Sequence, residues 1–286
     1  MKTSDMRVMI VGSGGREHAL ALRLMSSPLM AALVCAPGNG GTASIAGPVK
    51  NVAIDVNDVD AIVALAKREQ IDFVVVGPEG PLVLGVVDAL ADAGVLAFGP
   101  RAAAARLEGS KSFSKRFMQK HGVPTADFEV FDDCDAAQAF VRASGEAWVV
   151  KADGLAAGKG VIVASDVAET LDALERIMRA REFGAAGSEV VLERRLRGQE
   201  VSYHVVVDGT RGLPLAAAQD HKRIGDGDVG PNTGGMGAYS PPPVVTPEVE
   251  RRILDRIVAK TLAGFTADAI DFRGVLFIGL MIDPAG

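Results

Sequence analysis

Glycine-rich stretches that carry lysines are the parts of this sequence best suited to chemistry. The strongest is residues 150–161, VKADGLAAGKGV. Apolar strands flank a loop of small residues, so backbone N–H groups of the loop, together with Lys159, can close over a triphosphate. Lys151 on the first strand would meet the α- and β-phosphates as a point charge. The spacing is not G-x-x-x-x-G-K-[ST], which excludes a P-loop; a purely structural hairpin is the alternative.

A second glycine-rich loop, residues 12–15, follows an apolar strand and precedes Arg16 and Glu17. Its N–H groups can approach an anion at the start of the next helix, where Arg16 can add a charge-assisted contact. A dinucleotide fingerprint needs a glycine in place of Glu17 and an acidic residue about 20 positions on. Both are missing, so an NAD-linked oxidoreductase is disfavoured and a phosphate-bearing small substrate is expected. A tight turn without a ligand is the alternative.

Carboxylates follow two further strands. Glu79, in GPEGP at 77–81, suits an amine or hydroxyl at the mouth of a parallel sheet, or it stabilises the start of a helix through the helix dipole. In residues 191–200 a strand runs into a turn, and an adenine can pair with the backbone from Glu193 to Leu196 while Glu200 accepts from ribose hydroxyls. A solvated face is the alternative there.

A polar cluster, QDHKR at 219–223, is followed by a glycine-rich loop, GPNTGGMGAY at 230–239. Together they suit a carboxylate or an acyl phosphate, with backbone donors that stabilise developing oxyanion charge. His221 by itself is more typical of a hydrogen-bonded structural residue than of a base. The histidines show no metal-ligand spacing, so no zinc site is expected.

Alternating strands and helices must position the first two loops. Apolar strands without polar alternation, separated by helices, indicate βαβ units on a parallel sheet buried on both faces. Ligands on such sheets bind at the carboxyl ends of the strands. The expected strands are 7–11, 32–36, 73–76 and 95–98, and the expected helices are 18–25, 59–68 and 83–93.

The pattern changes after Gly99-Pro100, and mixed strands with few helices indicate an α+β second domain that begins near residue 107. The expected helices are 102–107, 110–121, 135–143 and 167–180. The expected strands are 128–131, 148–151, 161–163, 190–193 and 201–207.

Composition narrows the class of protein. The 286 residues are 48% hydrophobic and carry a formal net charge of −6, which excludes a disordered chain and disfavours a nucleic-acid binder. Cys35 and Cys134 show no disulfide or metal spacing and are expected to be small buried side chains. No apolar run suits a signal peptide or reaches the roughly 18 residues of a membrane span. The sequence predicts a cytoplasmic protein with no membrane partner.

Seven motifs in collinear order resemble phosphoribosylamine–glycine ligase, also called glycinamide ribonucleotide synthetase, of the ATP-grasp superfamily. The resemblance runs from residue 7 to the C-terminus. The motifs are GSGGREHAL (12–20), APGNGGT (36–42), GPEGPLV (77–83), LEGSKSF (107–113), KADGLAAGKGV (151–161), QDHKR (219–223) and GPNTGGMGAYSP (230–241).

The resemblance implies an α/β doubly wound parallel-sheet domain over 1–106, which helps bind the substrate. It implies an α+β ATP-grasp domain over 107–286, with a central ATP-lid subdomain at about 124–197. The enzyme of this family uses ATP and Mg²⁺ (or Mn²⁺) to phosphorylate glycine, and the amine of 5-phosphoribosylamine then attacks the glycyl phosphate. The products are glycinamide ribonucleotide, ADP and phosphate, in purine biosynthesis. Small molecules are the implied partners, and the family member is expected to be monomeric.

Site residues carry over motif by motif, as expectations from the resemblance. Contacts to ATP are expected from Lys111, Lys151, Gly158, Lys159, Gly160, Glu193, Leu196 and Glu200. Contacts to the other substrates are expected from Gly12, Gly14, Gly15, Arg16, Glu79, Asn232, Thr233, Gly234 and Gly235. The residues expected around the glycine carboxylate and the acyl phosphate in catalysis are Asp220, Lys222 and Arg223.

The sequence departs from the family pattern at the metal-binding motif. In the family, a strand with a Glu-x-Asn motif that binds Mg²⁺ follows the strand that reads GLMID, whereas here GLMID at 279–283 is followed only by Pro-Ala-Gly. No metal ligands are therefore expected in this chain, because the family's ligands would lie beyond Gly286. The ATP-grasp domain is expected to be incomplete at its C-terminal end, and phosphoryl transfer by the chain alone should be very slow. A non-catalytic or partner-dependent ATP-binding fragment is the alternative to a truncated ligase.

Overall fold

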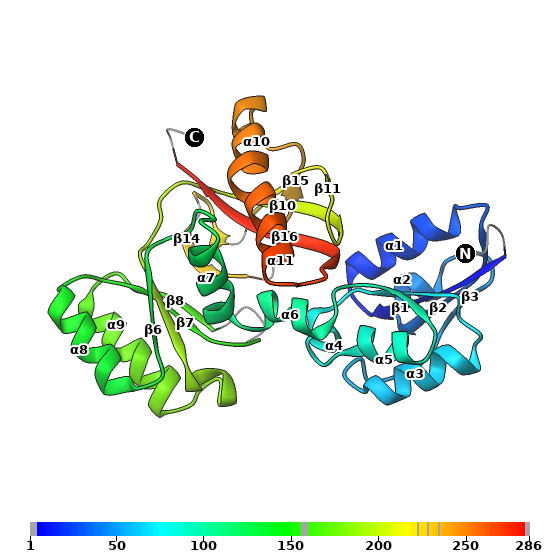
Figure 1. The fold of residues 1–286 in the computed structure, drawn as a ribbon, viewed down its shortest axis with the longest axis horizontal. Coiled ribbons are helices and arrows are strands. Elements are labelled where there is room, and N and C mark those ends of the chain that lie inside the picture. Colours follow the sequence, from blue (N-terminus) through cyan, green and yellow to red (C-terminus); the bar gives the residue numbers. More distant parts are fainter. Residues whose placement is uncertain (1–4, 156–159, 222, 228, 234, 284–286) are drawn as a thin grey trace. The chain divides into compact units, whose positions relative to one another are not determined.

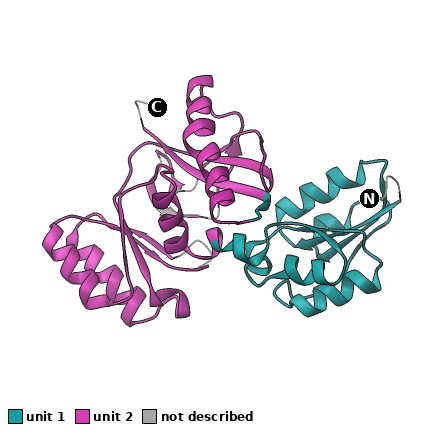
Figure 2. Cartoon of the chain, viewed as in Figure 1, with its two compact units in different colours: residues 1–106, 271–274 teal, residues 107–270, 275–286 magenta. Residues whose placement is uncertain are grey.

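The computed structural model describes residues 5–155, 160–221, 223–227, 229–233 and 235–283. Internal contacts divide the chain into two units (Figure 2). Unit 1 comprises residues 1–106 and 271–274, and unit 2 comprises residues 107–270 and 275–286. The helix α6 (Ala102–Gly109) runs across the division at Arg106.

Unit 1 is built on a five-stranded parallel sheet with the order β3-β2-β1-β4-β5. Figure 1 labels β1, β2 and β3 of this sheet. From β1 the chain moves outward through β2 to β3 and then crosses back to β4 on the other side of β1. The carboxyl ends of β1 and β4 therefore lie side by side where the order reverses, which is the ligand-binding position of open α/β sheets. The strands are β1 (Met6–Gly12), β2 (Met30–Pro37), β3 (Val49–Asn51), β4 (Phe73–Val76) and β5 (Leu96–Phe98).

Helices cover both faces of this sheet. Successive residues of β1 point to opposite sides, so the strand packs against helices on each face. Val8 packs with Ala21 of α1 on one face, and Met9 packs with Ile62 of α3 and Leu90 of α5 on the other. This arrangement confirms the prediction of a doubly wound parallel sheet. The helices of unit 1 ahead of α6 are α1 (Gly15–Met25), α2 (Gly40–Ala43), α3 (Val59–Arg68), α4 (Glu79–Val83) and α5 (Val86–Asp92).

One predicted helix of unit 1 is wrong in detail. A single helix is expected over 83–93, but the structure has two, α4 and α5, separated at Gly85. Gly85 has a φ of 86°, a left-handed conformation that glycine adopts without a steric penalty and that a continuous right-handed helix does not allow. The short β3 and α2 have no counterpart among the predicted elements.

The first part of unit 2 is a four-stranded antiparallel sheet with the order β6-β9-β7-β8. Trp148 and Val150 at β7 and Leu192 of β9 pack against Val141 of α8 and Leu174 of α9 in one buried cluster. The strands are β6 (Phe128–Phe131), β7 (Val149–Ala152), β8 (Val161–Val163) and β9 (Val190–Glu193). The helices are α7 (Lys111–Lys120), α8 (Cys134–Ser144) and α9 (Val167–Leu174).

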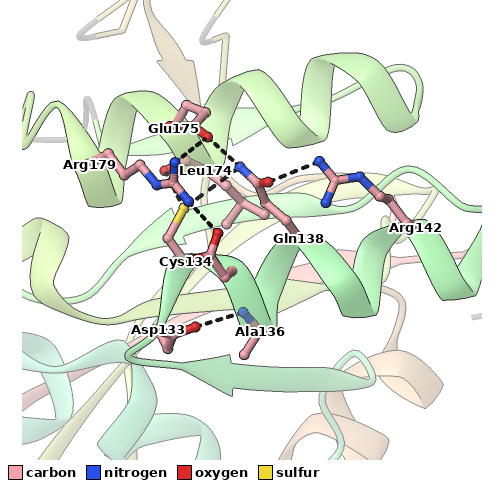
Figure 3. Close-up of polar contacts among 9 residues, drawn as sticks. Asp133, Cys134, Ala136, Gln138, Arg142, Leu174, Glu175 and Arg179 are labelled. Atoms are coloured by element: carbon pink, nitrogen blue, oxygen red, sulfur yellow. Dashed lines mark hydrogen bonds and ion pairs between the residues drawn. The ribbon is translucent and has the colours of Figure 1, made fainter.

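The helix expected over 167–180 is an α-helix only as far as Leu174. α9 ends at Leu174 and continues as a π-helical turn over Glu175–Arg179. Gln138 of α8 donates from Nε2 to Glu175 Oε1 at 2.6 Å, and Arg179 pairs with Glu175 (Figure 3). Cys134 lies beside this network and is only half-buried, whereas Cys35 is buried as expected. Burial, followed by the nearby Glu175, raises the pKa of the Cys134 thiol.

The second part of unit 2 is a three-stranded sheet, β11-β10-β16, with a long helical segment over residues 247–267. The sequence patterns do not assign this helical segment, and they identify β16 only through GLMID at 279–283, the counterpart of a strand in the family. α7 packs on α11, with the rings of Phe117 and Phe265 5.4 Å apart and His121 Nε2 2.9 Å from Asp268. The elements are β10 (Gln199–Asp208), β11 (Gly212–Pro214), β16 (Arg273–Ile282), α10 (Pro247–Ile253), a π-helical turn (Leu254–Val258) and α11 (Ala259–Ala267).

Within the described ranges, none of the helices combines the length and the apolar character that a membrane crossing requires.

Candidate active site

Two lysines of unit 2 share one carboxylate. Lys151 is on β7, Glu193 ends β9 and Lys115 is in the middle of α7. The antiparallel register places Val149 opposite Glu193, so Lys151 is a diagonal neighbour of Glu193 on the same face of the sheet. Lys151 Nζ is 2.8 Å from Glu193 Oε1, and Lys115 Nζ is 3.2 Å from Glu193 Oε2. Two strands and a helix thus contribute one residue each to a three-residue ion cluster.

The members of this cluster differ in burial. The side chains of Lys115 and Glu193 are 8% and 10% exposed, whereas that of Lys151 is 26% exposed. Lys115 Nζ also donates to Thr125 Oγ1 at 2.6 Å and lies 5.5 Å from the centre of the Phe128 ring. Burial lowers the pKa of Lys115, and the charge of Glu193 opposes that shift. Two cations against one anion leave a local excess of positive charge, which suits a ligand with several negative charges.

Lys111 lies one helical turn before Lys115 and connects α7 to the loop after β7. Its Nζ donates to the carbonyl oxygen of Gly154 at 2.7 Å. Asp153 Oδ1 accepts from the Ser112 N–H at 2.8 Å and from Ser110 Oγ at 3.3 Å, and Ser110 caps the N-terminus of α7. Burial lowers the pKa of Lys111, with the charge of Asp153 acting in the opposite direction. The expected phosphate contacts Lys111 and Lys151 are thus on neighbouring elements of one unit.

The rest of the expected ATP contacts are only partly described. Gly158 and Lys159 lie outside the described residues. Gly160 is buried, and its carbonyl accepts from the Ala152 N–H at 2.8 Å, which closes the hairpin at its base. Leu196, after β9, is 50% exposed, and Glu200 is an exposed residue of β10. The side chain of Glu193 contacts Lys151 and Lys115, and the expected contact of its backbone with adenine stays a prediction.

The structure brings the two motifs expected around glycine together as one antiparallel hairpin. β12 (Gln219–Asp220) pairs with β15 (Ala238–Tyr239), and β13 (Arg223–Gly225) pairs with β14 (Val229–Asn232). Between these pairs, the His221 N–H donates to the Gly237 carbonyl at 3.0 Å.

Individual residues of this hairpin are described unevenly. Asp220 is half-buried in β12, and Thr233 Oγ1 accepts from the Gly235 N–H at 3.0 Å. Lys222 and Gly234, and the side chains of Arg223 and Asn232, lie outside what the structure describes. The backbone pairing nevertheless places the two motifs on facing strands, as a shared site would require.

A buried carboxylate to which the sequence patterns assign no role organises the glycine loop of unit 1. Glu17 is 3% exposed, and its Oε2 accepts from the Gly14 N–H at 2.7 Å. Its Oε1 accepts from Arg16 Nε at 2.8 Å, and the Arg16 guanidinium also donates to the Gly77 carbonyl. Glu17 and Arg16 together therefore link the loop after β1 to the loop after β4. Its place as the third residue of α1, reaching back to the capping position at Gly14, is the sequence signal that could have revealed it.

Glycine is needed around Glu17 for space. A Cβ at Gly77 would lie 2.1 Å from Glu17 Oε1, and a Cβ at Gly12 would lie 2.8 Å from Glu17 Cγ. A Cβ at Gly15 would meet nothing within 4 Å. The Gly14 N–H, expected to face a phosphate, already donates to a carboxylate. Arg16, with its side chain 61% exposed, is the cation of this loop that solvent and ligands can reach.

Glu79 is exposed in the first turn of α4, at the carboxyl end of β4. This placement satisfies the helix-dipole alternative and also leaves the carboxylate open to a ligand.

The expected metal ligands are not part of the site that the structure describes. Among the described residues, no group of three or more His, Cys, Asp or Glu side chains is arranged to hold a metal ion. Gly286, beyond which the ligands are expected from the resemblance, itself lies outside the described residues, which end at Asp283. The expectation that the ligands lie beyond Gly286 therefore stays a prediction.

A doubly wound sheet followed by an antiparallel sheet with lysines at its glycine-rich hairpin defines the ATP-grasp class. The family model "Phosphoribosylglycinamide synthetase, ATP-grasp (A) domain" matches residues 109–286, and "Phosphoribosylglycinamide synthetase, N domain" matches residues 6–108. The chain belongs to the phosphoribosylglycinamide synthetase family.

Named relatives agree with this assignment. A phosphoribosylamine–glycine ligase of Xanthomonas campestris pv. campestris is 55% identical over 281 residues, which are 98% of this chain and 65% of that protein. The crystal structure of phosphoribosylamine–glycine ligase from Thermotoga maritima matches with a TM-score of 0.81 at 32% identity, over 98% of this chain and 66% of that one.

A more distant structure shares the fold. The biotin carboxylase domain of Hydrogenobacter thermophilus 2-oxoglutarate carboxylase, solved with MgADP, has a TM-score of 0.72 at 17% identity and covers 100% of this chain and 62% of that one. Across these comparisons the chain spans about two thirds of the length of its relatives, 65% for the Xanthomonas protein.

Proposed function

We propose that this chain carries the ATP-binding and substrate-binding parts of an enzyme that joins glycine to 5-phosphoribosylamine. The observation that carries the proposal is the lysine cluster of unit 2. Lys111 and Lys151 both stand where a glycine-rich hairpin begins, in a chain that matches the ATP-grasp family model over residues 109–286. Positive charge beside a loop of backbone amides suits polyphosphate.

The proposed reaction has two steps. The glycine carboxylate attacks the γ-phosphorus of ATP, the bond to the β-phosphate oxygen breaks, and glycyl phosphate and ADP form. The amine of 5-phosphoribosylamine then attacks the acyl carbon, phosphate leaves with the bonding electrons, and the nitrogen loses a proton to give the amide. Positioning and neutralisation of phosphoryl charge supply most of the catalysis in such transfers.

The proposed roles follow the site geometry. Lys111 and Lys151 would neutralise phosphate charge, and the hairpin with Gly158, Lys159 and Gly160 would cover it. The backbone from Glu193 to Leu196 would bind adenine, and Glu200 would bind the ribose. The hairpin with Asp220, Lys222, Arg223 and the 232–235 loop would hold glycine and its acyl phosphate.

For 5-phosphoribosylamine, Arg16 is the candidate cation for the sugar phosphate, with Gly12, Gly14 and Gly15 shaping the loop and Glu79 facing the amine. Because the Gly14 N–H donates to Glu17, the phosphate would rely on Arg16 more than on that amide.

A divalent cation such as Mg²⁺ would supply stabilisation of phosphoryl charge in this chemistry. The described residues do not supply a three-ligand cluster for it. We infer a cytoplasmic enzyme, since its substrates are small charged metabolites, and, from the family resemblance, a monomeric one.

Calorimetric titration of the chain with ATP and ADP tests nucleotide binding, and coupled detection of ADP tests turnover with Mg²⁺, glycine and 5-phosphoribosylamine. Lys151→Met should weaken ATP binding roughly 10- to 100-fold, the effect of one charge-assisted contact. Lys67→Met, which removes an exposed lysine of α3 in unit 1, is the matched control and should leave ATP binding unchanged.

Absence of ATP binding at millimolar concentration, or equal binding by Lys151→Met, would overturn the proposed site. Binding with very slow or no turnover is the result expected of the chain alone. Turnover at an ordinary enzymatic rate would contradict the expectation that the chain alone is slow.

A further inference from the structure

We propose that Lys115 is a positioning residue that makes Lys151 available to phosphates. It does so by holding the Glu193 carboxylate when Lys151 turns away from it. The inference rests on the proposed nucleotide site and assigns a role to a lysine that lies outside every motif named above.

Lys115 and Lys151 differ in how firmly the protein holds them. Lys115 Nζ has three oxygen partners: Glu193 Oε2 at 3.2 Å, Thr125 Oγ1 at 2.6 Å and the Ala126 carbonyl at 3.4 Å. Its side chain is 8% exposed. Lys151 is 26% exposed and contacts the other carboxylate oxygen, Oε1, at 2.8 Å. Lys115 is therefore fixed in the interior, and Lys151 is the partner that can move.

Phosphates and Glu193 compete for Lys151. Each N–H that the Lys151 ammonium turns toward a polyphosphate weakens its contact with Glu193 Oε1. Glu193 is 10% exposed, so releasing Lys151 without another cation would leave a buried charge unpaired, which is strongly unfavourable. The ion pair between Lys115 Nζ and Glu193 Oε2 removes the penalty of leaving the Glu193 charge unpaired.

The position of Lys115 in the sequence also links it to the proposed phosphate site. It is four residues after Lys111, so the two lysines lie on one face of α7. Lys111 reaches the Gly154 carbonyl in the loop after β7, and Lys115 reaches the end of β9. One helix thus carries both lysines, and of these two only Lys111 is expected to touch the ligand.

The test compares binding of ADP with binding of adenosine, which lacks the phosphates. Lys115→Met should lower the ratio of ADP affinity to adenosine affinity roughly 10-fold or more, because Lys151 stays bound to Glu193. Adenosine affinity should change less than about threefold. Lys115→Met combined with Glu193→Gln should recover most of the lost ratio, since the carboxylate that retains Lys151 is gone.

Two further variants guard against a trivial loss of folding. Thr125→Val removes an anchor of Lys115 Nζ and keeps the side-chain shape, so a smaller fall in the same ratio is expected if Lys115→Met does not fold. Lys120→Met removes an exposed lysine of the same helix, 63% exposed and paired with Asp268, and should leave the ratio unchanged. Circular dichroism checks the fold of each variant.

The outcomes separate this inference from the proposed function. No ADP binding by the unmodified chain overturns both. ADP binding by the unmodified chain with an unchanged ratio in Lys115→Met, or in Thr125→Val where the former is unfolded, overturns the positioning role alone. Equal weakening of ADP and adenosine also overturns it, because that pattern reflects a merely structural lysine.

Discussion

Replacing Gly77 by alanine should break the contact between the loop after β1 and the loop after β4 in unit 1. The loss of stability should come entirely from displacement of the Glu17 side chain. The new Cβ would lie 2.1 Å from Glu17 Oε1, 2.6 Å from Cδ and 2.8 Å from Cγ. Gly77 does not have a positive φ, so an alanine there meets no backbone strain of its own. The carboxylate must therefore move out of its buried position.

The cost follows from the bonds that Glu17 gives up. The Gly14 N–H loses a charged acceptor in a part-buried position, which is worth about 1.5–3 kcal/mol. The Arg16 pair adds at most about 1 kcal/mol, because that side chain is 61% exposed. The lower chain entropy of alanine in the unfolded state returns about 0.4–1 kcal/mol. The net loss should be about 2–3 kcal/mol, equivalent to about a 30- to 150-fold fall in local protection.

Hydrogen–deuterium exchange of β1 and the loop after it is the suitable assay. Tryptophan fluorescence would report on unit 2 instead, because Trp148, the one tryptophan of the chain, lies there. Exchange should rise in β1 and α1 and stay unchanged in β7 and β9. Gly15→Ala is the matched control: its Cβ meets nothing within 4 Å, and alanine in a helix should be neutral or slightly stabilising.

The coupling to Glu17 is the decisive measurement. In a Glu17→Ala background, Gly77→Ala should cost less than about 0.5 kcal/mol, since the atoms it displaces are gone. An equal cost in both backgrounds, or a Gly77→Ala variant with normal protection, would refute the reasoning.

Two other predictions concern titratable groups of unit 2. Hydrogen bonds from Lys120 and His121 lower the pKa of Asp268, so its contribution to stability is present above the unfolded-state value near 4 and is lost as the pH falls through the folded value; melting temperatures between pH 6 and pH 3 should fall less steeply for Asp268→Asn. Burial and Glu175 raise the pKa of Cys134, so its alkylation by iodoacetamide at pH 8 should be slower than in the urea-unfolded chain, and mass spectrometry that finds equal rates would contradict this.

The sequence predicts the elements of the fold well where a local pattern decides them. The strands at 73–76, 128–131, 161–163 and 190–193 and the helix at 59–68 have the predicted bounds. The break at Gly85 is harder to predict, because glycine within a helical pattern is often tolerated and only the tertiary path shows that it turns left-handed. The helical segment 247–267 is missing from the predicted elements, although Thr246 and Pro247 provide a clear capping signal.

Site residues are predictable from motifs when they face a ligand and much less so when they face another residue of the chain. Lys111 belongs to LEGSKSF and Lys151 to the glycine-rich KADGLAAGKGV, and Lys111 contacts the loop that follows the strand of Lys151. Lys115 lies outside the motifs, and Glu17 lies within one that assigns it no role. Their importance arises from long-range contacts, to Glu193 and to the Gly77 region respectively, which spacing along the chain does not reveal.

Both proposed anion sites are built around a buried glutamate, and this has a consequence for binding. In unit 1, Glu17 uses the Gly14 N–H and the Arg16 guanidinium, and in unit 2, Glu193 uses Lys151. An incoming phosphate meets cations that a carboxylate already engages in part, so ligands with more negative charge should bind more tightly. Selectivity for polyanions over singly charged molecules would then come from these internal competitors as much as from the lysines and the arginine themselves.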